Sequence, residues 1–318
     1  MRLVTYARND RVALGALLHG DVVDLHRAHL AALRHGGDLE EPAVACALVP
    51  PDMLGFLQGG EASMTAARQA LAFVEQYRAS GGQSAQAEEV CDPLDDVTLL
   101  APIQRPGKMV CVGLNYRSHL AEIHEPAPKY PILFHKVTTS LIGHRAEIVL
   151  PWISQQVDYE GELAVVIGKR CKSIPEQDAL CHVAGYACAN DVSAHDIEFR
   201  TSQWASGKML DTFCPLGPAL VTQDEIPDPG VLRLQTVLNG MIVQDSSTSD
   251  MVFSIPFLIS YISSLATLEP GDLILTGTPA GIGCNKTPMV FLQPGDDISI
   301  QIEGIGTLAN SVTAEAGR

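Results

Sequence analysis

The segment Asp158–Gly168 constrains the fold of this chain more than any other stretch. Its second half is an apolar run that ends at a glycine, which is typical of a buried β-strand. Because alternate residues of a strand share one face, Glu160 and Glu162 point the same way at the start of this run. Neighbouring carboxylates repel unless a cation lies between them, and a hard divalent ion with oxygen ligands is the simplest such cation.

A third acidic residue adds to this pair. Asp191 follows the short apolar stretch 185–188, so it is expected at the end of a second strand. Taken alone, adjacent glutamates at a strand end are more often a solvated edge than a metal site. Three carboxylates at strand ends, from Glu160, Glu162 and Asp191, instead suit a site for magnesium or manganese.

Composition and charge narrow the class of protein. The chain has 318 residues, enough for one large or two modest domains, and 46% hydrophobic with 18% charged residues indicates a globular protein. The net charge of −16 argues against nucleic-acid partners and against anionic membranes. A small anionic substrate remains compatible, because a bound cation reverses the local field.

The eight cysteines indicate a reducing compartment. No two are spaced C-x-x-C, and most lie in apolar runs, where a thiol packs as a small hydrophobe. We therefore expect reduced cysteines that form neither disulfides nor a zinc site, and a cytosolic protein. The N-terminal residues have no signal-type apolar core, and no run of about 18 apolar residues predicts a membrane span.

Two units are expected, with a boundary near residue 100. Residues 1–100 predict a small N-terminal α+β domain and a linker. The stretch 12–25 has the pattern of a hairpin that turns at Gly20-Asp21, and apolar residues between 64 and 74 recur at helical spacing. A glycine-rich linker is expected from Ala79 to about Asp96.

Residues 101–318 predict a larger unit that is rich in short strands. Alternating apolar residues indicate strands over 232–238 and 298–302, and Asn239-Gly240 predicts a tight hairpin turn after the first of them. One helix is expected from Ser173, which has capping-box spacing, and another from Ser254 to about residue 266.

His119 and Glu122 lie three residues apart, a spacing that makes them neighbours on one face of a helix. A glutamate beside a histidine can fix its tautomer and raise its basicity, as a general base needs. An ordinary surface pair would be the commoner reading if these residues stood alone. Lys136 follows an expected strand and Lys208 follows a glycine; each is either a solvated charge or a group that holds an anionic oxygen.

These motifs together resemble the fumarylacetoacetate hydrolase superfamily, over about residues 106–310. The resemblance is carried, in chain order, by residues 115–122, 134–136, 159–163, 190–193, 207–208, 211–213 and 275–279. The chain is most similar to the shorter, acylpyruvase-like or 2-hydroxyhepta-2,4-diene-1,7-dioate isomerase-like members, which act on 2-oxo or 2,4-dioxo acids, as in aromatic catabolism.

The resemblance implies an α+β, mainly β fold, with a mixed β-roll or sandwich that holds one Mg²⁺ or Mn²⁺ ion. It also implies a homodimer and a small dioxo-acid substrate. The metal ligands that it implies are Glu160, Glu162 and Asp191. The catalytic residues that it implies are His119 and Glu122, which would activate water on a mobile lid, and the electrophilic Lys208. The substrate contacts that it implies are Tyr116, Lys136 and Thr278.

Two positions depart from the family pattern of Ser-Ala-Arg-Asp followed, after one residue, by Gln. His195 stands in place of the arginine and Glu198 in place of the glutamine. These changes remove a permanent cation and a neutral amide and add a possible negative charge. If both side chains bind substrate, recognition of a carboxylate is altered; alternatively, His195 is a packed structural residue.

The expected activity is metal-assisted hydrolysis of the carbon–carbon bond between two carbonyls of a 2,4-dioxo acid. His119, oriented by Glu122, would take a proton from water. The same site could instead serve an isomerase or tautomerase, or a decarboxylase of a related 2-oxo acid. A non-catalytic metal-binding or ligand-binding homologue is a further alternative, which His195 and Glu198 favour.

Overall fold

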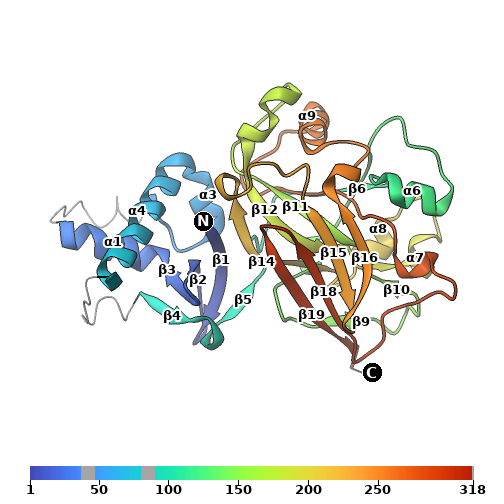
Figure 1. Cartoon of the computed structure of the whole chain (residues 1–318), viewed down its shortest axis with the longest axis horizontal. Coiled ribbons are helices and arrows are strands. Elements are labelled where there is room, and N and C mark those ends of the chain that lie inside the picture. The colour runs from blue at the N-terminus through green and yellow to red at the C-terminus, as the bar shows by residue number, and fades with distance from the viewer. Residues whose placement is uncertain (37–46, 80–89, 317–318) are drawn as a thin grey trace.

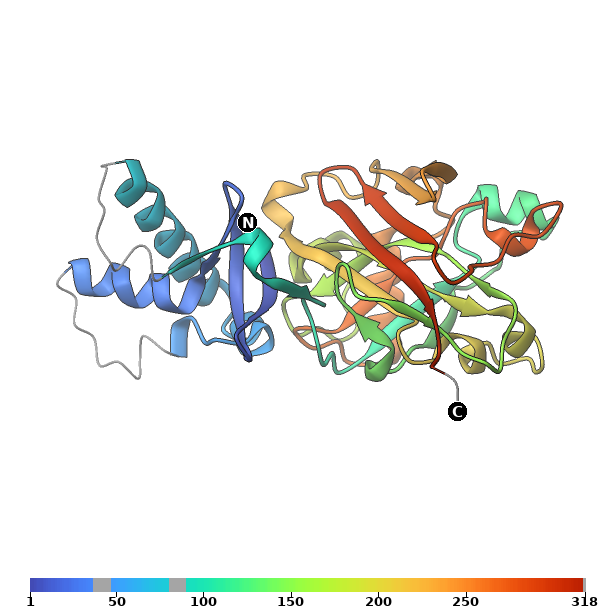
Figure 2. The same ribbon diagram turned by 90° about the horizontal axis from the view of Figure 1, so that it is seen from below.

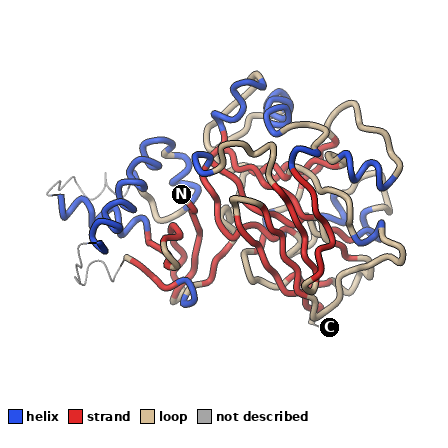
Figure 3. Tube along the Cα trace, in the orientation of Figure 1, coloured by secondary structure: helices blue, strands red, loops and turns tan. Residues whose placement is uncertain are grey.

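The computed structural model describes residues 1–36, 47–79 and 90–316. Strands dominate it, with helices at the periphery (Figures 1 and 3). The strands of the largest sheet are β1 (Arg2–Arg8), β2 (Arg11–Leu18), β3 (Asp21–Asp24), β4 (Cys91–Pro93), β5 (Thr98–Leu100), β6 (Met109–Gly113), β7 (Ile132–His135), β8 (Leu141–Ile142), β11 (Gly161–Ile167), β12 (Val183–Asn190), β14 (Cys214–Thr222) and β17 (Leu273–Leu275).

Two further sheets complete the strand content of the described residues. The five-stranded sheet contains β9 (Ile148–Leu150), β15 (Arg233–Leu238), β16 (Met241–Ser247), β18 (Asp297–Ile302) and β19 (Gly306–Ala314), and a two-stranded ribbon contains β10 (Val157–Asp158) and β13 (Ser193–Ala194). The large sheet runs β4-β3-β2-β1-β14-β12-β11-β17-β6-β7, with β5 paired to β1 and β8 to β14, and the smaller one runs β16-β15-β18-β19-β9.

The helices are short apart from one in the N-terminal part. They are α1 (Leu25–Gly36), α3 (Met53–Gln58), α4 (Gly60–Ala79), α6 (Arg117–Ile123), α7 (His195–Glu198), α8 (Ala205–Lys208) and α9 (Ile255–Leu265). The 3₁₀ helices are η1 (Leu94–Asp96), η2 (Thr138–Ser140), η3 (Glu176–His182), η4 (Gln223–Glu225), η5 (Thr248–Asp250) and η6 (Gly283–Asn285).

The two large sheets pack face to face and form a sandwich. Alternate residues of β11 and β12, among them Leu163 and Tyr186, meet Leu234 and Ile300 of the smaller sheet in one buried cluster. Burial of these faces removes apolar area from water and is the main contribution to holding the sheets together. The expectation of an α+β, mainly β sandwich is confirmed.

The N-terminal part extends the large sheet at one end, as Figure 2 shows. Strand β1 pairs antiparallel with β14, with Leu3 opposite Leu220. Leu3 and Leu14 share a buried cluster with Ala164 and Leu216 of the larger part. The boundary near residue 100 stays a prediction, since the two parts share a sheet and a core.

Most local expectations agree with the structure. β2 and β3 form the first hairpin, although its turn lies at His19-Gly20, one residue before the expected position. β15 and β16 form the second, where Asn239 and Gly240 both have positive φ, as a tight turn needs. The residues between 64 and 74, which recur at helical spacing in the sequence, lie in helix α4. Ser254 begins α9, and its hydroxyl accepts the Phe257 amide hydrogen.

Two local expectations are wrong. Ser173 does not cap an α-helix, because its φ of 53° is left-handed, whereas a capping residue needs an extended backbone; the segment forms η3 instead. The expected linker is partly ordered, since β4 pairs with β3 inside it. Its residues 80–89 lie outside the described part of the chain.

The cysteines of the described part are free thiols, and Cys46 lies outside it. Among the described residues, no helix combines the length and apolar character needed to cross a bilayer.

Candidate active site

The strand register brings the three acidic residues together. β11 and β12 are antiparallel, with Glu162 opposite Ala189, so that Glu160 at the start of one strand lies beside Asp191 at the end of the other. The Asp191 amide donates to the Glu160 carbonyl at 2.9 Å, and the Glu160 amide donates to Asn190 Oδ1 at 2.9 Å. One carboxylate oxygen from each acidic residue lies within 4.8 Å of the other two.

Two lysines face these carboxylates. Lys208 Nζ donates to Glu160 Oε1 at 2.8 Å and to Asp191 Oδ2 at 3.0 Å. Lys136 Nζ bonds to Asp191 Oδ1 from the other side and to the Val192 carbonyl at 3.1 Å. All five charged side chains are buried. Three carboxylates against two ammonium groups leave one negative charge without a partner.

The pKa shifts of the three carboxyl groups reflect this uncompensated negative charge. Burial raises the pKa of Glu162 well above its usual value, and the Asp191 and Glu160 carboxylates raise it further. Burial also raises the pKa of Glu160, to about 6, although Lys208 opposes the rise. Burial acts on Asp191 in the same direction, but Lys136 and Lys208 together hold its pKa below the usual value.

A divalent cation fits this site. The donors are all carboxylate oxygens, which hard ions prefer, and they converge in a buried place where the three carboxylates outnumber the two ammonium groups by one charge. The Gly277 amide donates to Glu162 Oε2 at 2.8 Å, so the carboxylate is already oriented by the backbone.

Helix α6 carries the histidine and glutamate. His119 Nδ1 lies 3.4 Å from Glu122 Oε2, and Glu122 is itself held by the Gly281 amide and by Asn285 Nδ2, both at 2.9 Å. A proton on Nδ1 therefore points at the carboxylate, which leaves Nε2 free to accept a proton. Burial lowers the pKa of His119 from its usual value despite the opposing effect of Glu122, which favours the neutral ring.

One cavity of about 470 Å³ joins the metal-ligand candidates to the histidine. Its polar lining includes His119, Glu160, Glu162, Lys208 and Thr278. Its apolar lining includes Phe134, Trp204, Ile282, Met289 and Phe291. The expected base, electrophilic lysine and two of the expected ligands thus face the same enclosed space, and Asp191 lies directly behind it.

Two expected substrate contacts lie away from the cavity. Tyr116 is fully buried in the sandwich core and does not line the cavity. Lys136 lies behind Asp191 and serves as its counter-charge. Thr278 does line the cavity, but its hydroxyl donates to the Gly161 carbonyl and accepts from Gln244 Nε2.

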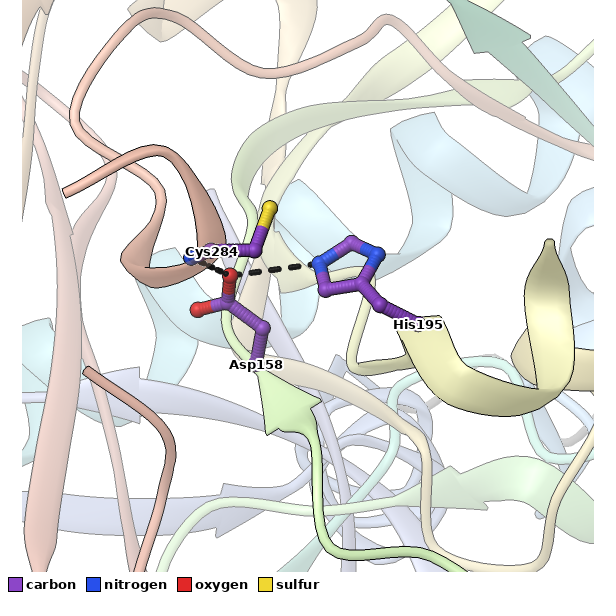
Figure 4. Close-up of side chains that lie close together, drawn as sticks. All are labelled: Asp158, His195 and Cys284. Atoms are coloured by element: carbon purple, nitrogen blue, oxygen red, sulfur yellow. Dashed lines mark hydrogen bonds and ion pairs between the residues drawn. The ribbon is translucent and has the colours of Figure 1, made fainter. Parts of the chain in front are cut away.

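His195 is held between two carboxylates, and both of its ring nitrogens are engaged. Nδ1 lies 2.9 Å from Glu198 Oε2. Nε2 lies 3.2 Å from Asp158 Oδ2, a contact that is drawn in Figure 4. Burial opposes a charge on this ring, but Asp158, Cys284 and Glu198 raise its pKa to about 12. His195 and Glu198 line the cavity, and their polar atoms also contact each other.

Sequence reasoning missed several residues that shape the site. Gln244, in β16, accepts from the Gly161 amide and from Thr236, and its amide group donates to Thr278 and to the Pro279 carbonyl. Nothing in the hairpin pattern could have found it, because its partners come from distant segments. Asp158 begins the segment Asp158–Gly168, but no sequence spacing indicates that it contacts His195.

Comparison with known proteins agrees with this geometry. Residues 108–313 match the family described as Fumarylacetoacetate (FAA) hydrolase C-terminal. The human protein named oxaloacetate tautomerase FAHD2A, mitochondrial, is 47% identical over 266 residues, which cover 83% of this chain and 80% of that protein. The chain therefore belongs to the fumarylacetoacetate hydrolase superfamily, as the motifs predict.

Solved structures add two enzymes of the same fold. The 2-hydroxyhepta-2,4-diene-1,7-dioate isomerase from Mycobacterium marinum is 34% identical, covers 100% of both chains and has a TM-score of 0.71. The maleylpyruvate hydrolase from Sphingobium sp. SYK-6, in complex with manganese(II) ion and pyruvate, is 28% identical over 99% of this chain and 100% of that chain, with a TM-score of 0.72. The family is thus enzymatic, with tautomerase, isomerase and hydrolase members.

The expectation of a cytosolic protein is contradicted by these relatives, since the human, bovine and rat proteins are all named mitochondrial. The expectation rested on reduced cysteines. Free thiols argue only against an oxidising compartment, and they do not distinguish one reducing compartment from another.

Proposed function

We propose that this protein is a metal-dependent tautomerase that interconverts the keto and enol forms of a small 2-oxo acid such as oxaloacetate. The observation that carries the proposal is a neutral, oriented base, His119, in the same cavity as a carboxylate cluster suited to a divalent cation. The likeness to the human oxaloacetate tautomerase supports the choice of reaction.

Three acidic residues, Glu160, Glu162 and Asp191, would hold Mg²⁺ or Mn²⁺ through carboxylate oxygens. When bound, the ion would polarise the 2-oxo group and so acidify the neighbouring carbon. Lys208 uses two of its hydrogens on Glu160 and Asp191, and the third can be donated to an anionic substrate oxygen.

His119 transfers the proton between carbon C3 and the 2-oxo oxygen of the substrate. In the keto-to-enol direction Nε2 takes a proton from C3, and the same proton, or one exchanged for it, is then delivered to the 2-oxo oxygen. Glu122 keeps the other ring nitrogen protonated and stabilises the imidazolium that forms between the two transfers. No water is consumed and no carbon–carbon bond breaks, so the reaction balances within the substrate.

Hydrolysis of a 2,4-dioxo acid is the second candidate. The cavity of about 470 Å³ can hold a longer acid than oxaloacetate, and its apolar wall suits an acyl chain. The same His119–Glu122 pair could take a proton from water in such a reaction. The likeness to a maleylpyruvate hydrolase supports this alternative.

A direct assay separates the two candidates. Crystalline enol oxaloacetate is dissolved with enzyme and Mg²⁺ or Mn²⁺, and the loss of enol absorbance and the release of pyruvate are followed together. We expect metal-dependent acceleration of enol loss, and deuterium exchange at C3 in heavy water, without matching pyruvate release. Cleavage of acylpyruvates without any acceleration of enol loss would refute the tautomerase and favour the hydrolase. Metal-stripped enzyme is the control.

The pH dependence of kcat/KM should follow the protonation of His119. Burial lowers the pKa of this ring below 6.5, and the ring must be neutral to accept a proton, so the neutral fraction falls only as pH drops through that lowered value. We expect kcat/KM, measured at saturating metal, to decline as the pH falls, with the midpoint of the decline below 6.5, the ordinary pKa of a histidine. A decline centred above pH 7 would contradict this role.

The homodimer remains a prediction from the family resemblance. The absence of nucleic-acid and membrane partners remains a prediction from the charge of −16.

A further inference from the structure

The geometry points to a second metal site in the cavity wall, formed by Asp158, His195 and Cys284, that takes a thiophilic divalent ion such as Zn²⁺. The three side chains come from β10, α7 and η6, and one potential ligand atom of each lies within 4.8 Å of the other two (Figure 4). No short spacing in the sequence joins them, so the absence of C-x-x-C pairs did not exclude such a site.

The distances suit a zinc ion. Bonds of about 2.0–2.3 Å to nitrogen, oxygen and sulfur place tetrahedral ligand atoms roughly 3.3–3.7 Å apart. His195 Nε2 and Asp158 Oδ2 are already 3.2 Å apart, and the ion would replace the proton between them; this proton and that of the Cys284 thiol leave to solvent. Because the partly exposed Cys284 side chain can rotate, a small movement of its sulfur would complete the set. His195 and Cys284 both line the cavity, so a fourth coordination position would face the open space.

The surrounding groups hold two of the ligands in place. Glu198 Oε2 lies 2.9 Å from His195 Nδ1, the arrangement in which a carboxylate orients a metal-binding histidine through its other nitrogen. Asp158 accepts the Gly283 amide hydrogen at 2.9 Å and the Cys284 amide hydrogen at 2.7 Å. These contacts fix the carboxylate and the imidazole before any ion arrives, which lowers the cost of ordering them on binding.

Donor chemistry distinguishes this cluster from the carboxylate site. Glu160, Glu162 and Asp191 offer oxygen alone, which suits Mg²⁺ or Mn²⁺. Asp158, His195 and Cys284 offer oxygen, nitrogen and sulfur, which suit Zn²⁺ and related ions. The two clusters should therefore prefer different ions when both kinds are present.

Cobalt(II) is the probe for this site, because it replaces zinc in such sites and a cobalt–thiolate bond gives an intense near-ultraviolet charge-transfer band. Chelator-treated full-length protein is titrated with Co²⁺ while excess Mg²⁺ occupies the carboxylate site. We expect the band to saturate at one Co²⁺ per chain and to be lost when one equivalent of Zn²⁺ is added. Absence of the band in the wild-type protein would overturn the proposal.

Variants identify the thiol. Cys284→Ser and Cys284→Ala should both lose the band and weaken Zn²⁺ binding by at least about tenfold, while their Mn²⁺ affinity and circular dichroism stay unchanged. Cys181→Ser is the matched control, since Cys181 is exposed and lies in η3, and it should keep the band. A band that persists in both Cys284 variants would refute the site, and so would a band that Cys181→Ser abolishes.

Discussion

Glu162→Gln should abolish tight Mn²⁺ binding and lower kcat/KM by about 10³-fold, because a metal ion supplies several kcal/mol of transition-state stabilisation. Glutamine preserves the size of the side chain and can still accept the Gly277 amide hydrogen that Glu162 Oε2 accepts at 2.8 Å. It removes the negative charge, and a neutral amide oxygen is a poorer ligand than a carboxylate. The change therefore tests the charge of this buried ligand with little change of shape.

Calorimetry and thermal unfolding measure this effect without relying on activity. At a free Mn²⁺ concentration of 100 times Kd, the ion should stabilise the wild-type protein by about 2.7 kcal/mol and the variant by almost nothing. Glu269→Gln is the matched control, since Glu269 forms an exposed ion pair with Arg170 at 2.9 Å. Undiminished Mn²⁺ binding by Glu162→Gln would exclude Glu162 from the ligands.

His119→Asn should lower kcat by about 10²–10⁴-fold, the usual contribution of a positioned general acid or base. Asparagine can still donate a hydrogen bond toward Glu122, whose carboxylate lies 3.4 Å from His119 Nδ1, but it cannot accept and return a proton at pH 7. Because His119 is not among the metal-ligand candidates, Mn²⁺ affinity should be unchanged. Loss of rate with retained metal binding is thus the expected signature.

His124→Asn is the control for this change. His124 lies just beyond the C-terminus of the same helix, is exposed, and has a φ of 59°, a left-handed conformation that asparagine tolerates well. Initial rates of enol loss and Mn²⁺ titrations on both variants complete the comparison. A His119→Asn enzyme that kept the full rate of tautomerisation would show that the proton moves through another group.

Local pattern was enough to predict the first components of the site. The shared face of Glu160 and Glu162 follows from the two-residue period of a strand, and the proximity of His119 to Glu122 follows from the helical spacing. The position of Asp191 after an apolar stretch added a third carboxylate, and the family motifs gave Lys208 its expected role. The structure places Lys208 Nζ 3.0 Å from Asp191 Oδ2.

Other features depended on which way a side chain or the backbone turns, which a motif does not specify. Tyr116 belongs to the same motif as His119, yet its ring enters the sandwich core. Lys136 follows a strand as expected, but it approaches Asp191 from the side away from the cavity. Ser173 has the spacing of a helix cap, but its left-handed backbone rules that role out. Motif membership does not encode these orientations, which depend on packing between distant elements.

By itself the sequence determined the strand and helix pattern, the acidic pair and the histidine–glutamate pair, because each of these rests on contacts between residues close in the chain. Only the tertiary structure decided that His195 meets Asp158 with Cys284 beside it, and that Gln244 supports the loop at Thr278. The physical reason is that sheet register and packing bring these groups together across long separations, and no local period records such contacts.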